Sequence, residues 1–124
     1  MPNDPSAEVP PLRERLRAAL PAAMKRRDRN ATKALRSALA AIDNAEAIDA
    51  SHITAGAIEA TPVGLGTAEA QRRLLTESDM ERIVHQEITE RLTTAAEYDQ
   101  LARPAHASDL RAEAEELTRH LPTD

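Results

Sequence analysis

The chain has neither phenylalanine nor tryptophan, and Tyr98 is its only aromatic residue besides the histidines. A hydrophobic core must therefore be built from leucine, isoleucine, valine and alanine, which bury less area per residue than aromatic side chains do. Only 3 of the 124 residues are glycine, whereas alanine, leucine, glutamate and arginine are abundant. These residue types favour helices, so the composition predicts an all-α protein with a modest aliphatic core in one domain.

The composition also excludes several classes of site and location. The chain has no cysteine, which excludes disulfides, thiolate metal sites and a cysteine nucleophile. No apolar run approaches the roughly 18 residues that a transmembrane helix needs. The first residues include Asp4 and Glu8 where a signal peptide carries positive charge, and they lack an apolar segment. We therefore expect a cytoplasmic protein that needs no cofactor and has no membrane segment.

Prolines and apolar spacing divide the first half of the chain into an arm and two helices. Residues 1–11 contain four of the 8 prolines and predict a disordered arm, with Pro11 as the first residue of a helix. Pro21 is expected to interrupt and kink this helix, at a cost of about 3 kcal/mol. Asp28 is expected to cap a second helix that runs to about Asp49.

The second half contains a connection and two further helices. Residues 50–75 include all three glycines, lack helical periodicity and predict a long flexible connection. Thr76 is expected to cap a third helix that stops near Pro104. Ser108 is expected to cap a fourth helix, which Pro122 ends.

Apolar residues recur at three- and four-residue spacing in each predicted helix, as Ala31, Leu35 and Ile42 do in the second. Helices with one apolar face bury it against one another. We therefore predict an all-α, four-helix bundle-like domain over residues 12–122, with a long flexible connection between its second and third helices.

The net charge of -5 is distributed very unevenly. Residues 11–36 carry nine basic and two acidic side chains, a net charge of +7, whereas residues 37–124 carry seven basic and seventeen acidic ones, a net charge of -10. Basic residues of the second helix form a stripe opposite its apolar face, which is either a solvated surface or a phosphate-binding one. The scarcity of aromatic residues argues against sequence-specific reading of single strands. The RNA-binding candidates are Lys25, Arg26, Arg29, Lys33 and Arg36.

A second polar feature is a pair of opposite charges, Glu87 and Arg91, that falls within the apolar face of the third helix. The acid precedes the base by four residues, the favourable order for a helical ion pair. Burial of such a pair is costly unless further polar groups join it. Two interpretations stay open: a structural network that ties helices together, involving Glu46 or Arg36, or a pocket for a polar ligand or an RNA phosphate.

The four histidines predict no metal site. His52, His85, His106 and His120 are too far apart for a metal-binding motif, and each is expected to be solvated. The serines and threonines lie at caps and in the connection, without a nucleophile-elbow pattern. The sequence therefore predicts no catalytic residues and no metal ligands.

Taken in chain order, several segments resemble the GatB/YqeY family. The resemblance covers about residues 12–49 and 74–122, and the order and spacing of its short matches make it specific. The matching residues are Leu16, Ala23-Met24-Lys25, Asp28, Leu35-Arg36, Ala41-Ile42, Asn44, Glu46-Ala47-Ile48, Leu75-Thr76-Glu77, Glu87, Arg91, Tyr98, Leu110, Glu113, Glu116-Leu117 and Leu121-Pro122. The polar positions among them are Asn44, Glu46, Glu87, Arg91 and Glu113.

This family is a helical module shared by YqeY-like proteins and by the tail of the B subunit of the glutamine-dependent tRNA amidotransferase. The resemblance implies an accessory, tRNA-associated role under the family label of carbon–nitrogen ligase with glutamine as amido-N-donor, without catalysis by this chain alone. The implied partners are tRNA and amidotransferase subunits or another protein. The alternative is a protein-interaction or oligomerisation module that binds no RNA.

Two departures from the family pattern bear on that role. Family members usually continue after the Leu121-Pro122 pair with another small helical segment, whereas this sequence ends at Asp124. The connection at residues 50–75 is also longer than the short turn that the resemblance implies. The first departure is expected to weaken any RNA contact that the additional segment makes.

Overall fold

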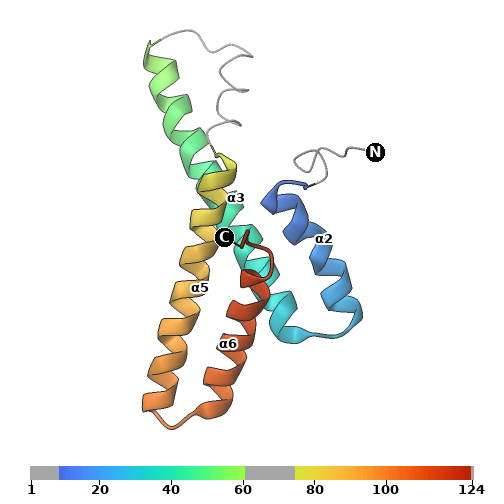
Figure 1. Ribbon diagram of the computed structural model, residues 1–124. Coiled ribbons are helices and arrows are strands. Elements are labelled where there is room, and N and C mark those ends of the chain that lie inside the picture. Colours follow the sequence, from blue (N-terminus) through green and yellow to red (C-terminus); the bar gives the residue numbers. More distant parts are fainter. Residues whose placement is uncertain (1–8, 61–74, 124) are drawn as a thin grey trace, which may run out of the picture.

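A computed structural model describes residues 9–60 and 75–123, with residues 49–60 described by their backbone alone. This part of the chain contains four α-helices and no strand: α2 (Leu12–Lys25), α3 (Arg29–Ala60), α5 (Glu77–Gln100) and α6 (Pro104–Thr118). The last two form an antiparallel pair, and α3 packs against both of them and against α2 (Figure 1). The predicted all-α bundle is confirmed.

The core is aliphatic, as the composition requires. Its largest fully buried side chains come from all four helices and are Leu12, Leu16, Leu35, Ile42, Val84 and Leu117. Between them lie buried alanines, including Ala31, Ala34, Ala38 and Ala114. Small side chains at these positions let the helices pack closely without aromatic residues to fill the space. The apolar face predicted for the second helix is confirmed.

The first helix differs from its prediction at both prolines. Pro11 precedes α2 as its N-cap, and its side chain cannot accept a hydrogen bond from the first turn. Glu77 of α5 accepts instead: its Oε1 and Oε2 lie 3.1 and 2.9 Å from the backbone nitrogen of Leu12. The predicted interruption at Pro21 is wrong, because α2 runs through it to Lys25. Pro21 is exposed, so water can satisfy the carbonyl that loses its N–H partner.

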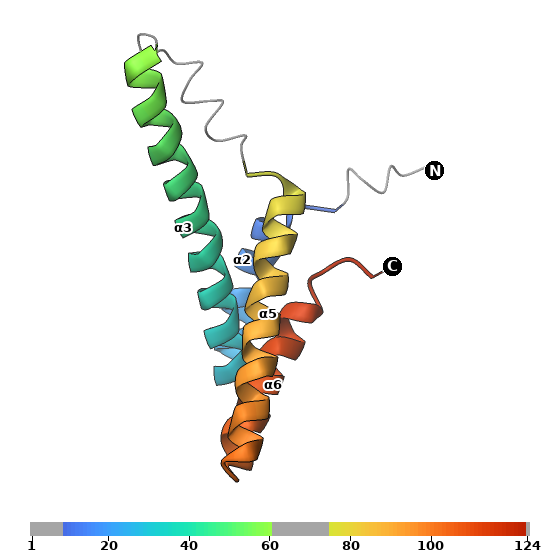
Figure 2. The same cartoon turned by 90° about the vertical axis from the view of Figure 1, so that its left-hand side faces the viewer.

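The second helix is longer than predicted. Asp28 caps it as expected, but α3 continues past Asp49 to Ala60, and Figure 2 shows this end extending beyond the rest of the bundle. The flexible connection predicted from residue 50 is therefore wrong for residues 50–60. Gly56 is the only glycine there, and one interior glycine costs a helix about 1 kcal/mol rather than ending it. The remaining residues of the predicted connection, 61–74, lie outside the described residues.

The third helix begins as predicted and the fourth does not. The Thr76 hydroxyl accepts from the backbone of Asp79, and the Asp79 carboxylate accepts from the backbone of Thr76, each at 3.0 Å. The N–H of Thr76 is the main reason that the pKa of Asp79 is lowered. Ser108 is not a cap: α6 begins at Pro104, whose missing N–H is tolerated in a first turn. This helix ends at Thr118, four residues before the proline predicted to end it.

Among the described helices, none combines the length with the apolar character that crossing a bilayer requires.

Candidate functional site

The corner between α2 and α3 places a group of basic residues on the surface. Arg27 has a φ of 59°, in the left-handed region, and its N–H donates to the carbonyl of Met24 at 3.0 Å. The N–H of Asp28 donates to the carbonyl of Ala23, also at 3.0 Å. These two bonds form a Schellman motif, which usually has glycine at the left-handed position. An arginine at this position has a backbone conformation that is less favourable for it than for glycine, and it places a charged side chain at the corner.

Asp28 then begins α3. Its Oδ1 accepts from the N–H of Ala31 at 3.0 Å, and Arg26 lies 3.5 Å from Oδ2. The Ala31 N–H, more than the guanidinium of Arg26, lowers the pKa of the Asp28 carboxyl. One residue thus closes the end of α2 and caps α3, so Arg27 and Arg29 are held on either side of a short, defined corner.

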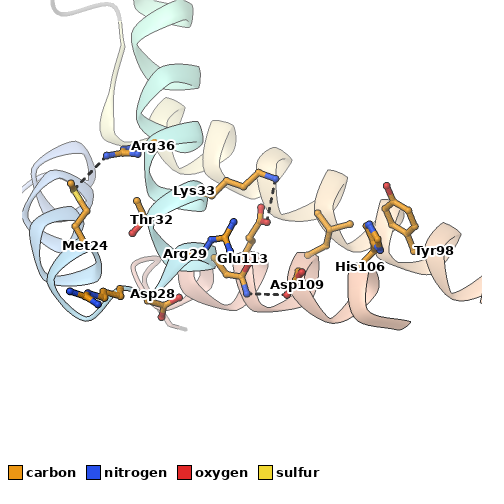
Figure 3. Close-up of a pocket in the computed structure, with 13 residues that line it drawn as sticks. Met24, Asp28, Arg29, Thr32, Lys33, Arg36, Tyr98, His106, Asp109 and Glu113 are labelled. Carbon is orange, nitrogen blue, oxygen red and sulfur yellow. Dashed lines mark hydrogen bonds and ion pairs between the residues drawn. The ribbon is translucent and has the colours of Figure 1, made fainter. Parts of the chain in front are cut away.

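A groove of about 880 Å³ opens beside this corner, between α3 and the α5–α6 pair. One part of its lining is basic, and the other contains the rings of Tyr98 and His106 (Figure 3). The basic side chains that line it are Arg27, Arg29, Lys33 and Arg36, all of them exposed. The groove therefore brings cations of the basic stripe together with the only tyrosine of the chain.

Among the described residues, the cations of the groove have no strong partner. Within the described residues, no carboxylate pairs with Arg27, Arg29 or Arg36, and the Nη2 of Arg36 lies 3.6 Å from the sulfur of Met24. Lys33 Nζ is 3.9 Å from Oε2 of Glu113, but its side chain is 72% exposed. An ion pair that long and that exposed contributes little, so these charges remain available to a ligand.

The three carboxylates of the groove are, by contrast, already engaged. Asp28 caps α3, as described above. Asp109 Oδ1 lies 3.3 Å from the amide nitrogen of Asn30, which donates to it. Glu113 Oε1 accepts from Nε of Arg91 at 2.9 Å. The acidic side chains are thus held by groups of the protein, whereas the basic ones face solvent.

Two rings stack at the end of the groove farther from Met24. The centroids of Tyr98 and His106 are 4.9 Å apart, and their planes differ by 28°. His106 lies in the first turn of α6 rather than in a turn between helices, and it is exposed. Tyr98 comes from the last turns of α5, so the reversal of the chain between these helices brings the rings together.

Glu87 and Arg91 form the ion pair that their spacing predicts, with Oε1 and Nη1 2.9 Å apart. Ser37 of α3 donates to the same Oε1 at 2.8 Å, and Arg91 also binds Glu113 of α6. Glu113 is only 3% exposed. We call Ser37, Glu87, Arg91 and Glu113 the buried network; it joins three helices, and the structural interpretation of this pair is confirmed.

The expected partners of the buried network were wrong. Glu46 lies at the other face of α3 and pairs with Arg13 of α2 at 3.1 Å. Arg36 lines the groove instead. Asn44 is exposed on α3. Of the five family-pattern polar residues, Glu87, Arg91 and Glu113 come together and Asn44 and Glu46 do not join them.

The RNA-binding candidates also separate into two groups. Arg29, Lys33 and Arg36 line the groove together. Lys25 and Arg26 are exposed at the end of α2 and do not line it. Sequence reasoning left out Arg27, because the corner has no glycine to mark its left-handed position.

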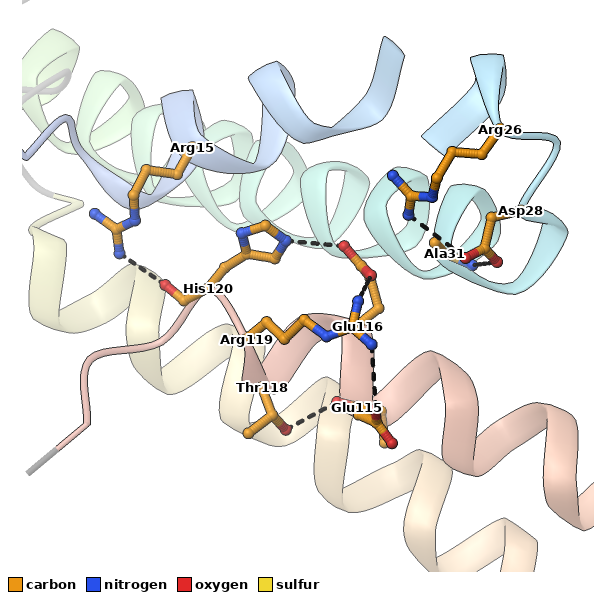
Figure 4. Close-up of polar contacts among 10 residues, drawn as sticks. Arg15, Arg26, Asp28, Ala31, Glu115, Glu116, Thr118, Arg119 and His120 are labelled. Carbon is orange, nitrogen blue, oxygen red and sulfur yellow. Dashed lines mark hydrogen bonds and ion pairs between the residues drawn. The ribbon is translucent and has the colours of Figure 1, made fainter. Parts of the chain in front are cut away.

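A third polar cluster lies near the end of the described chain (Figure 4). His120 Nε2 is 2.9 Å from Glu116, and its carbonyl accepts from Arg15 of α2 at 2.9 Å. Arg119 binds the same carboxylate at 2.8 Å. The prediction of a solvated histidine is therefore wrong for His120, while His85 is exposed as expected.

This third cluster joins residues that are already paired with one another, and it adjoins a second hollow of about 740 Å³. The side chain of His52 lies outside the described residues. In the part of the chain that the structure describes, no group of three or more histidines and carboxylates is arranged to hold a metal ion.

Comparison with known proteins assigns no relative. No family model, curated protein or solved structure matches the chain. The resemblance to the GatB/YqeY family therefore stays a prediction.

Proposed function

We propose that this chain is a non-catalytic accessory module that binds RNA, with tRNA as its partner. One observation carries the proposal: Arg27, Arg29, Lys33 and Arg36 line one groove, exposed and without a strong carboxylate partner among the described residues. Free cations in a row suit a ligand that carries a row of negative charges, and each phosphate they bind releases counterions.

The chemistry of the groove suits phosphate groups. Three of its four cations are arginines, whose planar guanidinium groups bind phosphate oxygens through two hydrogen bonds at once. The positive end of the α3 dipole adds to the same field, because Arg29 is the first residue of that helix. A polyphosphate backbone meets several such groups at once.

The choice of tRNA rests on the resemblance to the GatB/YqeY family. An accessory role of this kind belongs beside a glutamine-dependent amidotransferase, whose subunits are then further partners, and it implies a cytoplasmic location. Under this proposal the amide-forming chemistry resides in the partner enzyme, and the chain contributes RNA binding.

The test is the salt dependence of tRNA binding. The logarithm of the affinity should fall linearly with the logarithm of salt concentration, and the triple variant Arg29/Lys33/Arg36→Ala should flatten the slope by about two to three units. The matched control is Arg82/Arg103/Arg111→Ala, which removes three exposed cations that do not line the groove. The control should retain most of the wild-type slope.

Two results would overturn the proposal. One is an absence of tRNA binding by the wild-type chain at about 50 mM salt, where the electrostatic contribution is near its strongest. The other is an equal loss of slope in the triple variant and its control, because binding would then follow net charge rather than the groove.

A second candidate function, docking to another protein, is favoured by a different observation. The end of α3 extends beyond the bundle (Figure 2), and Ile48 of the same helix is 69% exposed. An exposed apolar side chain on a helix suits a helix–helix contact with a second copy. Sedimentation of the wild type and of Ile48→Glu tests this: a dimer that dissociates in the variant, with no tRNA binding, would favour docking over RNA.

A further inference from the structure

The basic groove contains a feature that phosphate binding alone does not use. Tyr98 and His106 stack on each other within its lining, on helices other than the one that carries Arg29, Lys33 and Arg36. An exposed ring beside a row of cations is the combination with which proteins hold unpaired nucleotides, since every base has a face that can stack.

The structural explanation for the ring pair covers only part of it. Tyr98 is half-buried and packs where α5 meets α6, so it helps to hold that hairpin together. His106 is exposed, and its stacking on Tyr98 occupies only one of its faces. The histidine is thus the exposed ring of the pair, and it lies in the lining of the groove.

The cations extend along α3 over a length that suits a short strand. Arg29 and Arg36 are seven residues apart on α3, or about 10 Å at 1.5 Å per residue. Figure 3 shows Lys33 between the Met24 end of the groove and the two rings. A base on His106 would therefore leave its phosphate, and the next ones along the strand, beside Lys33 and the arginines.

We propose that the groove binds a single-stranded RNA segment, with a base stacked on the His106–Tyr98 pair and its phosphates on Arg29, Lys33 and Arg36. This inference rests on the proposed RNA binding and adds that the ligand must be unpaired. Bases inside a duplex are stacked on their neighbours, so they cannot reach the rings. Because stacking is tolerant of base identity, the groove selects unpaired nucleotides rather than a sequence.

Tyr98 makes the inference directly measurable. The chain contains no tryptophan and no other tyrosine, so its intrinsic fluorescence comes from this residue alone. The probes are a short oligoadenylate, the same strand in a duplex, AMP, and an inorganic polyphosphate, all at about 50 mM salt. We expect oligoadenylate to bind most tightly and to change the Tyr98 emission, whereas polyphosphate binds without that change.

The variant that isolates stacking is His106→Ala, since the residue is exposed and alanine suits a helix. It should weaken oligoadenylate binding about 5- to 100-fold while leaving polyphosphate affinity and the salt slope as in the wild type. His85→Ala removes an exposed histidine of α5 outside the groove and should bind like the wild type. Circular dichroism of both variants checks that the fold is retained.

Each other outcome has a definite meaning. If duplex binds as tightly as oligoadenylate, or if His106→Ala binds like the wild type, the stacking inference is wrong and RNA binding by charge still stands. If AMP binds as tightly as oligoadenylate, the further phosphates add nothing and the proposed strand is wrong. If the wild-type chain binds none of the probes at low salt, the proposed function itself is wrong, and the inference with it.

Discussion

The buried network and the basic groove lie side by side, but charged side chains are paired at close range in the network and exposed in the groove. In the buried network, Arg91 is bound by Glu87 and Glu113 at 2.9 Å each, and the three side chains are at most 16% exposed. In the groove, the cations are exposed and lack strong partners among the described residues. Glu113 touches both regions, through Arg91 on one side and Lys33 on the other.

The difference shows two roles that a charged residue on a helix can have. A buried charge loses its hydration, so the fold tolerates it only with partners at close range. An exposed charge keeps its hydration and gains little from a neighbour, so it is free to exchange water for a ligand. The buried network therefore helps to determine how α3, α5 and α6 pack, and the groove leaves its charges available to a ligand.

The largest expected effect tests the first half of this comparison. Arg91→Ala removes the shared partner of two carboxylates, one of them only 3% exposed, and should lower the free energy of unfolding by about 3 kcal/mol. Arg82→Ala, at an exposed ion pair of the same helix, should cost less than about 0.5 kcal/mol. Urea denaturation of both variants measures the difference.

A repair variant separates lost charge pairing from lost packing. Glu87→Leu/Arg91→Met/Glu113→Leu replaces the ions by apolar side chains and should recover most of the stability that Arg91→Ala loses. Small and equal losses for Arg91→Ala and Arg82→Ala would show that the buried network is no more structural than a surface pair, and the contrast with the groove would disappear.

Most of the fold could be predicted because its signals are local. The apolar face of the second helix and the Asp28 and Thr76 caps are each encoded within a few adjacent turns. Boundaries were missed where one residue supports two interpretations. A proline can follow one helix or begin the next, and Pro104 begins α6, while Gly56 weakens a helix without breaking it.

The candidate site also has one part that could be predicted from the sequence and one part that could not. The row Arg29, Lys33 and Arg36 could be predicted, since it follows from the spacing of one helix. The meeting of Tyr98 and His106 could not, because it depends on how the chain reverses at Ala102, where φ is 57°. No periodicity within either helix contains that information.

The next prediction compares the two corners of the bundle, which share one backbone geometry. Arg27 and Ala102 both occupy the left-handed position of a Schellman motif, where a side chain costs energy that glycine avoids. Arg27→Gly and Ala102→Gly should each raise the free energy of unfolding, by about 0.5–1 kcal/mol, in thermal or urea denaturation.

The two glycine variants should differ in binding. Arg27→Gly should weaken tRNA binding because Arg27 lines the groove, whereas Ala102→Gly should not. Ala112→Gly, in the exposed interior of α6, is the control and should lower stability by about 1 kcal/mol. A loss of stability in Arg27→Gly would show that the arginine is retained for packing, not for a ligand.

The smallest expected effect is a gain of stability when basic side chains of the groove are replaced by alanine. Arg29 places a cation at the positive end of the α3 dipole, which costs about 0.3–1 kcal/mol. Lys33 follows it by four residues and precedes Arg36 by three, so neighbouring cations repel along one helix face. The Lys33–Glu113 contact opposes this weakly, because it is long and its lysine is exposed.

The triple variant Arg29/Lys33/Arg36→Ala should therefore be more stable than the wild type, by about 0.5 kcal/mol, at low salt. The gain should shrink in about 1 M salt, where the repulsion is screened, and urea denaturation at both concentrations measures it. A surface that costs stability and binds phosphate resembles a site retained for its ligand. A loss of more than about 1 kcal/mol at either salt concentration would instead place these residues with the buried network, as part of what holds the helices together.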